Sequence, residues 1–278
     1  MQYVPGETLA QTFAANRAHG LIALTVELRA GFTRRARIRE QGPLRVRCPG
    51  APRAELEAVI VNTAGGVAGG DRHEIAVEVA PAARLTVTSA AAEKIYRSSG
   101  PSAQLAIRLK VGAAGALSWL PQECILYDNA RMERVIEVDL AGDASLIMAE
   151  AIVLGRSGMG ENVQQCRLFD RWNIRRGGVL LHVEAMRLDG AVGAKLAQRA
   201  VARGDVALAT VFAAPADDGT AALLREVTQQ CAAEVGISAW NGFLVARLCA
   251  PAGAALRRDL ITLLTALRKA PLPRLWLN

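Results

Sequence analysis

The sequence predicts a mainly β protein whose strands stack as in a β-helix or solenoid, followed by a small helical part near the C-terminus. Two observations support this prediction. Apolar and polar residues alternate over many short segments, which is the period of a strand with one buried face. In the middle of the chain the pattern returns about every 30 residues, which indicates a repeated unit whose copies must stack to bury their apolar sides.

The size and composition of the chain are those of a protein that folds around its own core. Its 278 residues are 51% hydrophobic and 4% aromatic. A chain of this length buries roughly 70–75% of its unfolded surface and needs no disulfide or metal to fold. We expect one domain over 1–278, with a β body at about 20–215 and with helices, a closing strand and a tail at about 216–278.

The number and spacing of the cysteines indicate the cellular compartment, and the net charge indicates the classes of partner. The five cysteines are odd in number and none forms a Cys-x-x-Cys pair, which favours a reducing, cytoplasmic compartment. The chain has no leader-like start and no run of ~20 apolar residues, so we expect no membrane association. The net charge of +7 suits nucleic acid or an acidic protein. No nucleic-acid-binding module is recognisable, so we expect no nucleic-acid partner.

The first strands are expected between residues 20 and 48. Apolar residues alternate at 24–28 and arginines alternate at 35–39, so each segment fits a strand with one buried and one polar face. A Gly-Pro turn at 41–43 separates the second strand from a third at 44–47, because these residues favour turns over strands.

The middle of the chain contains three copies of a strand, a small-residue turn and a second strand. Three alternating apolar residues precede each turn, and a leucine follows it. Such units fit a stacked β solenoid or a sandwich with tight corners, and three ordinary hairpins of one antiparallel sheet are the alternative. The copies are 75–79 with the turn 80–83 and Leu85, 107–111 with the turn 112–115 and Leu117, and 136–140 with the turn 141–144 and Leu146.

Two helices are expected in the C-terminal part. They span about 221–235 and 254–269, where leucines recur at helical spacing. The second helix is expected to end before Pro271, with Arg268 and Lys269 in its last turn, where cations suit the helix dipole. Further strands are expected at 179–188, 205–213 and 243–248.

Motifs for phosphate binding and catalysis are incomplete. The glycine-rich segment 64–71 ends in Asp71, whereas a P-loop ends in Gly-Lys-Ser/Thr and an aspartate repels phosphate. We interpret it as a tight double turn or the backbone-lined wall of a channel. Ser157 lacks the last glycine of a nucleophile elbow, so a serine hydrolase using Ser157, His182 and Asp189 is a minor alternative. The three histidines do not have the spacing of zinc ligands.

Three carboxylates stand among apolar residues of the expected strands: Glu123, Glu150 and Glu184. Burial of a carboxylate is costly unless it is paired or hydrated. These side chains therefore lie either on the surface or along an internal, water-filled path. Oxygen ligands would let a divalent cation pass, whereas nitrogen or sulfur ligands would bind a transition metal too tightly for passage.

Several segments resemble one known family in order and spacing over nearly the whole chain. The most specific is the glycine-rich turn, which is followed by a Thr/Ser-containing strand and by the ending Lys-Ile-Tyr-Arg-Ser. In these features the chain resembles the UreD (also called UreH) family of urease accessory proteins. Glu93 departs from the family, in which this position is often Thr. The similar segments are 41–46, 65–71, 85–89, 93–98, 117–123, 125–130, 154–161 and 273–276.

The resemblance implies a non-enzymatic protein that helps nickel reach urease. Members of the family act with a helical accessory protein, UreF, and a nickel-binding GTPase, UreG, in a complex that docks on the urease apoprotein. A dimer of such heterocomplexes is expected, and nickel is thought to pass through an internal tunnel, so no tightly bound cofactor is expected. From polarity on otherwise apolar strands, we predict nickel contacts at Asp71, Glu150 and Glu184, with Thr88, Ser89, Glu123 and His182 lining the path.

A surface for the helical partner is predicted in the C-terminal part. The high apolar content suggests a large apolar patch, and such patches usually mark a partner surface. An all-β interaction module unrelated to nickel is the alternative from another functional class, and it predicts that urease activation does not depend on this chain. The predicted partner-binding residues are Leu223, Leu256, Leu260, Leu264, Arg274 and Trp276.

Overall fold

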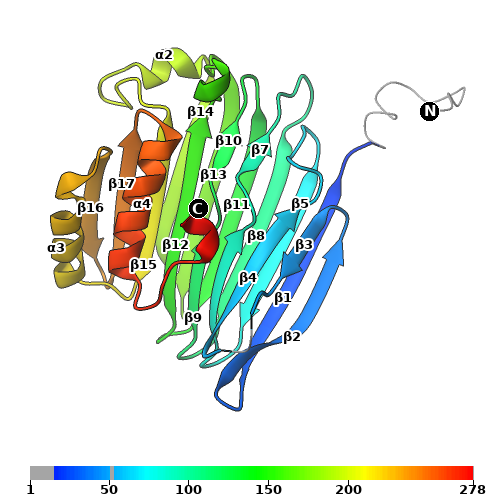
Figure 1. The fold of residues 1–278 in the computed structure, drawn as a ribbon, viewed down its shortest axis with the longest axis vertical. Coiled ribbons are helices and arrows are strands. Elements are labelled where there is room, and N and C mark those ends of the chain that lie inside the picture. Colours follow the sequence, from blue (N-terminus) through cyan, green and yellow to red (C-terminus); the bar gives the residue numbers. More distant parts are fainter. Residues whose placement is uncertain (1–15, 51–52, 278) are drawn as a thin grey trace, which may run out of the picture.

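The computed structural model describes residues 16–50 and 53–277. Two β-sheets face each other, and helices lie against the outer side of one of them (Figure 1). The prediction of a mainly β, stacked-strand fold with a C-terminal helical part is confirmed. None of the described helices is long and apolar enough to cross a membrane. In spatial order the first sheet contains β14 (Val179–Gly190), β13 (Cys166–Arg176), β11 (Arg131–Leu140), β8 (Ala103–Val111), β5 (Arg72–Val79), β1 (His19–Arg29) and β2 (Phe32–Gln41).

The second sheet carries the partner strands of the same repeating units. Two short strands, β7 (Glu93–Ile95) and β10 (Cys124–Leu126), extend it beside the end of β12. In spatial order its main strands are β16 (Glu234–Trp240), β17 (Phe243–Ala250), β15 (Ala207–Ala214), β12 (Ser145–Leu154), β9 (Ala116–Leu120), β6 (Arg84–Ser89), β4 (Glu55–Asn62) and β3 (Leu44–Arg47).

The predicted repeat is a coil of a solenoid. Each coil takes one strand in the first sheet, turns, and continues as a strand in the second sheet, so that β5–β6, β8–β9 and β11–β12 stack in parallel. Equivalent residues of the three copies therefore lie side by side and bury the same face. The in-register sets are Ile75, Ile107 and Ile136, then Val77, Leu109 and Val138 in the first sheet, and Leu85, Leu117 and Leu146 in the second.

The turns between the two sheets stack as closely as the strands do. The backbone N–H of Gly112 donates to the carbonyl of Val79 at 2.8 Å, and that of Ala141 donates to Val111 at 2.9 Å. A Cβ atom on Gly112 would lie 2.8 Å from the backbone nitrogen of Pro81 in the turn below. Only glycine allows the backbones to approach this closely, so the small residues of the turns set the spacing of the coils.

The helices cover the outer face of the second sheet. Helix α4 (Gly253–Leu267) lies across β15 and β17, and α3 (Asp218–Val227) lies beside it (Figure 1). The strands below present alanines such as Ala209 and Ala246 to these helices, and their small side chains let the helix leucines pack close to the sheet. The remaining short helices are α2 (Val192–Leu196), η1 (Ser157–Met159), η2 (Thr228–Gln230) and η3 (Arg274–Trp276).

The first predicted C-terminal helix is shorter than expected. It ends at Val227, and residues 234–240 form β16, which pairs antiparallel with β17. The hydroxyl of Thr228 donates to the carbonyl of Leu224 at 2.8 Å, a bond that competes with continuation of the helix. The strand-favouring residues that follow then pair with the open edge of β17.

The second C-terminal helix was predicted almost to its ends, but its last residue behaves differently. Arg268 is extended rather than helical, and its guanidinium reaches Glu55 at 3.2 Å and Thr86 at 3.1 Å on the second sheet. Tertiary hydrogen bonds therefore take the place of the expected interaction with the helix dipole.

We predict that Gly112→Ala destabilises the protein by about 1–3 kcal/mol, because its methyl group must push the stacked turns apart. The matched control is Gly142→Ala in the next turn, where a Cβ would have no neighbour within 4 Å, and it should change stability by less than about 0.5 kcal/mol. Urea unfolding of both variants measures the difference. Equal unfolding midpoints would contradict the role of Gly112 in spacing the coils.

Candidate functional site

A buried cluster of charged side chains lies between the two sheets. Arg134 on β11 donates from Nη2 and Nε to both oxygens of Asp170 on β13, at 2.6 and 2.9 Å. Its Nη1 donates to Glu150 of β12, in the opposite sheet, at 2.5 Å. The second oxygen of Glu150 accepts a hydrogen bond of 2.7 Å from the indole of Trp119. We call these four residues, together with the adjacent Cys124, the arginine cluster.

The electrostatics of the arginine cluster follow from its burial, since Arg134 is 2% exposed and Glu150 and Asp170 are each 4% exposed. Burial opposes the charge of Arg134, but Asp170 and Glu150 outweigh it and hold the pKa of the guanidinium above its usual range. Burial raises the pKa of Glu150 despite the adjacent Arg134. One guanidinium thus faces two carboxylates, and a proton on Glu150 would balance the second negative charge.

Polar groups continue from the arginine cluster toward one edge of the sandwich. Glu150 is in register with Thr210 on β15, which is in register with Arg247 on β17. Arg247 Nη2 contacts Glu184 of β14 at 2.5 Å. His182 Nε2 lies 3.4 Å from the same carboxylate. Burial raises the pKa of Glu184, but the neighbouring His182 and Arg247 outweigh this effect and hold the pKa below its usual value.

Polar groups also continue in the other direction, toward the glycine-rich turn. Glu93 on β7 is in register with Cys124 on β10, and Arg134 Nη1 lies 3.6 Å from the Cys124 sulfur. Asn62 donates at 3.0 Å both to Glu93 and to the carbonyl of Gly66 in the turn. Burial raises the pKa of Glu93 to about 7 and that of the Cys124 thiol to about 12. We call the whole series, from Asn62 through the arginine cluster to Glu184, the polar layer.

The polar layer brings together three of the predicted path residues. Glu150, Glu184 and His182 belong to it, and the alternative that Glu150 lies on the surface is excluded by its burial. Sequence reasoning missed Arg134, Asp170 and several others, although the alternation of buried residues on β11 and β13 places both at inward positions. The missed members are Asn62, Glu93, Trp119, Cys124, Arg134, Asp170, Thr210 and Arg247.

Asp71 has another role in this structure. Its two carboxylate oxygens accept hydrogen bonds of 2.8 Å from the backbone N–H groups of Ala18 and Ala68, so it fixes the glycine-rich segment. That segment is the expected tight double turn, with positive φ at Gly65 and Gly70. The carboxylate is thus engaged by backbone donors rather than by members of the polar layer.

The other three predicted path residues meet around Gln122, at the end of β6 and beside the connection between β9 and β10. Thr88 Oγ1 accepts a hydrogen bond of 3.4 Å from the amide of Gln122, and the Gln122 backbone N–H donates to Ser89 at 2.9 Å. Glu123 lies 3.4 Å from Arg257 of α4. Arg257 also donates to the carbonyl of Leu275 at 2.8 Å, so this group fastens the C-terminal segment to the sheet.

The structure does not bring Ser157 and His182 together as a hydrolase would need. Ser157 lies in η1, in the connection that leads to the start of β13. His182 is in register with Ile174 of β13. Ile174 is eight residues beyond the start of that strand, which is roughly 26 Å at the rise of a strand. The ring of His182 stacks on Phe212 with centroids 5.6 Å apart.

Most of the predicted partner-binding residues are part of the core in this structure. Leu256, Leu260, Leu264 and Trp276 are each at most 2% exposed, because they pack on the outer face of the second sheet. Leu223 is 46% exposed, so it remains on the surface.

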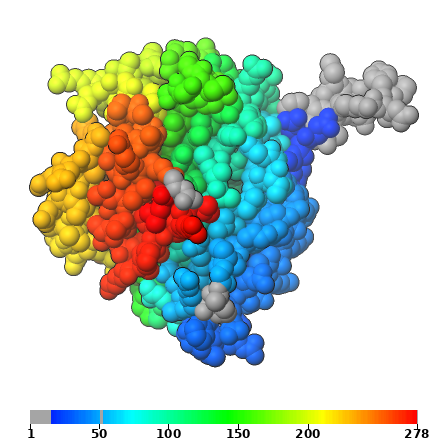
Figure 2. Space-filling view, viewed as in Figure 1, coloured from blue at the N-terminus to red at the C-terminus, as the bar shows by residue number. Residues whose placement is uncertain are grey.

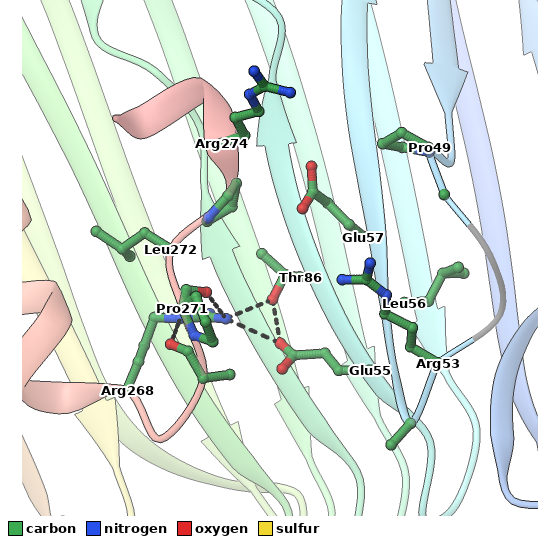
Figure 3. Close-up of a pocket in the computed structure, with 14 residues that line it drawn as sticks. Pro49, Arg53, Glu55, Leu56, Glu57, Thr86, Arg268, Pro271, Leu272 and Arg274 are labelled. Carbon is green, nitrogen blue, oxygen red and sulfur yellow. Dashed lines mark hydrogen bonds and ion pairs between the residues drawn. The ribbon is translucent and has the colours of Figure 1, made fainter. Parts of the chain in front are cut away.

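Arg274 lines a surface groove of about 510 Å³ between β4 and the C-terminal segment (Figure 3). Arg268 and Glu55 meet inside the groove, where Thr86 joins them. Burial raises the pKa of Glu57, which also lines it, against the opposing influence of Arg268. The groove therefore combines polar side chains with the apolar surface of residues such as Leu272.

Among the described residues, no three His, Cys, Asp or Glu side chains are grouped so that they could hold a metal ion. The carboxylates of the polar layer are engaged by arginine, amide and indole donors. The raised pKa keeps the Cys124 thiol protonated, and a thiol binds metal only after losing its proton. The described residues of the polar layer therefore form no preformed metal site.

We predict that Arg134→Met costs about 3–5 kcal/mol at pH 7, because two buried carboxylates lose their counter-ion. The loss of stability should shrink toward pH 5 as Glu150, whose pKa is raised by burial, takes up a proton. The control is Arg108→Met on the exposed face of β8, where Arg108 lies 3.7 Å from Glu74, and it should cost less than about 1 kcal/mol. Urea unfolding at both pH values is the measurement. An equal effect of the two substitutions would contradict this account of the cluster.

A second prediction concerns Glu93. Its pKa is raised from 4.5 to about 7 on folding, so its favourable contribution is complete below pH 4.5 and is lost as the pH rises to about 7. Glu93→Gln, which can still accept from Asn62, should therefore stabilise the protein at pH 8 by at most about 3 kcal/mol and have little effect at pH 4.5. Stability curves that run parallel from pH 4.5 to 8 would refute the burial of a titrating carboxyl here.

Comparison with known proteins identifies the family. The family model for the UreD urease accessory protein matches residues 18–277. A urease accessory protein UreD of Rhodopseudomonas palustris (strain ATCC BAA-98 / CGA009) is 52% identical over 271 residues, which cover 98% of this chain and 97% of the relative. Another, of Bradyrhizobium diazoefficiens (strain USDA 110), is 52% identical over 266 residues, with 96% of each chain covered. The resemblance found in the sequence is thereby confirmed, and the chain belongs to the UreD family of urease accessory proteins.

Proposed function

We propose that this protein is a cytoplasmic, non-enzymatic urease maturation factor that helps pass nickel to the urease apoprotein. Membership of the UreD family over residues 18–277 carries this proposal, because the relatives are named for accessory action on urease. In this role it acts as a chaperone within a complex: it binds the apoprotein and a UreF-like helical protein directly, and a UreG-like GTPase through the complex. A dimer of such heterocomplexes is the proposed assembly, and nickel is cargo rather than a resident cofactor.

The polar layer is the proposed route for nickel. It runs through the core from Asn62, beside the glycine-rich turn, past Glu93 and Glu150 to Glu184 at the β14–β17 side. Its carboxylates outnumber the guanidinium inside the arginine cluster, so a divalent cation would be attracted there. Single oxygen ligands favour brief contacts over tight binding.

The side chains of the polar layer would have to move for an ion to pass. In this conformation Arg134 forms ion pairs with Glu150 and Asp170, the two carboxylates that would receive nickel. Passage therefore requires the guanidinium to release one of them, and the proton favoured by the raised pKa of Glu150 to leave. Docking of a partner is the proposed trigger, because the cluster joins strands of both sheets and responds to any shift between them.

The helical partner is proposed to dock over the C-terminal part. The exposed side chain of Leu223 on α3 and the groove beside Arg274 remain accessible there, while the leucines of α4 are already used by the core. The groove offers both apolar and charged contacts (Figure 3), which is the composition of an interface with a polar rim.

The test is urease activation in a nickel-supplied host that makes the apoprotein, the helical partner and the GTPase, with or without this chain. Urease activity and nickel content should both fall to background without it. Full nickel loading in its absence would overturn the maturation role and favour an interaction module unrelated to nickel.

The route itself is tested by Glu150→Gln and Glu184→Gln. Each keeps the shape of the side chain but removes the charge, so we expect a several-fold loss of nickel content in urease while the assembled complex is retained. The control is Glu78→Gln on the exposed outer face, where Glu78 pairs with Lys110 at 3.1 Å. Nickel loading that is unchanged in both route variants would exclude the polar layer as the path.

A further inference from the structure

The positive charge of this protein is concentrated in one short segment. Residues 29–53 contain eight arginines and one glutamate, which gives a net charge of +7. The rest of the chain has 25 basic and 25 acidic residues and is neutral overall. The whole excess charge of the protein therefore comes from 25 consecutive residues, which include β2 and β3. We call the described part of this segment the arginine edge.

The arginine edge lies at the margin of the molecule, where both sheets end (Figure 2, blue, lower right). Strand β2 is the outermost strand of the first sheet and β3 that of the second. Arg34, Arg37 and Arg39 pair in register with Glu27, Thr25 and Ala23 of β1, whose side chains alternate with buried ones. The three arginines are exposed, and no described carboxylate lies within salt-bridge distance of them.

A cleft of about 370 Å³ separates β2 from β3 within the arginine edge. Its apolar lining comes from Ala36, Ile38 and Val46, while arginines stand around it. The single acidic residue, Glu40, is already engaged by the Val46 N–H at 2.6 Å and by Arg47 at 3.0 Å. The cleft thus has the shape and charge to receive an acidic side chain with an apolar neighbour.

The interior strands of the first sheet carry charges of both signs on their outer face, in contrast to β2. On these interior strands the charges alternate in sign and pair across strands, with Glu78 3.1 Å from Lys110 and Glu74 3.7 Å from Arg108. A few charges suffice to keep an edge strand from aggregating. A cluster of charges of one sign is instead destabilised by repulsion among its own charges, but it attracts an oppositely charged surface more strongly.

We propose that the arginine edge is a docking surface for an acidic face of a partner protein, with Arg34, Arg37 and Arg39 pairing carboxylates and the cleft receiving one acidic side chain. Planar guanidinium groups bind carboxylates in paired hydrogen bonds. Surfaces for single-stranded nucleic acid interleave basic residues with aromatic rings on which bases stack, and β2 offers only Phe32. The inference goes beyond nickel transfer, because it concerns recognition of a protein surface by the β2–β3 margin, which adjoins the groove beside Arg274 at Arg53.

The test uses the full chain, together with its helical partner where that is needed for solubility. Poly-L-glutamate and an oligothymidylate of equal charge are the two probes. The chain should bind polyglutamate more tightly, with an affinity that falls as salt is raised. The triple substitution Arg34→Gln, Arg37→Gln and Arg39→Gln should weaken polyglutamate binding about tenfold.

A charge-matched variant separates a docking surface from a general effect of net charge. Arg72→Gln, Arg167→Gln and Arg258→Gln together remove the same charge from exposed positions elsewhere, and affinity should stay within about twofold. Equal weakening by both triple variants would overturn the proposal, and so would tighter binding of the oligothymidylate. Urease activation is measured in parallel. If the unmodified chain fails to support activation, the maturation role fails, while the polyglutamate result still decides the arginine edge.

Discussion

Arg134 ties the two sheets of this protein together through charge. Its guanidinium donates to Asp170 in its own sheet and to Glu150 in the opposite sheet, at the level between two apolar clusters of the core. Buried ion pairs add little net stability, but a buried pair with one member missing is strongly unfavourable. The arrangement therefore fixes which strands face each other, since a slip of one residue would leave a charge without its partner.

The arginine cluster separates two apolar regions of the core. On one side the coils stack apolar residues in register from β5 to β13. On the other side a second apolar cluster includes Met132, Ile152 and Leu168, and between the two regions polar groups extend to the glycine-rich turn and to the β14–β17 edge. A solenoid allows this division, because each coil contributes one residue to each row and a row can be polar without interrupting its neighbours.

The outer surfaces are divided as well. Helices α3 and α4 and the C-terminal segment cover the alanine-rich face of the second sheet, while the outer face of the first sheet carries paired charges. The positive excess lies at the β2–β3 margin, away from the carboxylates of the interior. A cation inside and an acidic partner outside would therefore be attracted to different parts of the molecule.

The alternation of apolar residues and the spacing of the small-residue turns were enough to predict the stacked strands from the sequence, since both are local patterns. The same alternation marked Glu150 and Glu184 as unusual. It did not reveal their partners, because Arg134, Asp170 and Arg247 come from other strands and meet them only after the sheets have stacked. Tertiary structure also decided that residues 234–240 join a sheet rather than extend a helix, because the open edge of β17 outweighs local helix preference. It likewise made Leu256, Leu260 and Leu264 core residues: helical spacing identifies an apolar face, but only the completed fold determines whether the chain's own alanine-rich sheet or another protein covers it.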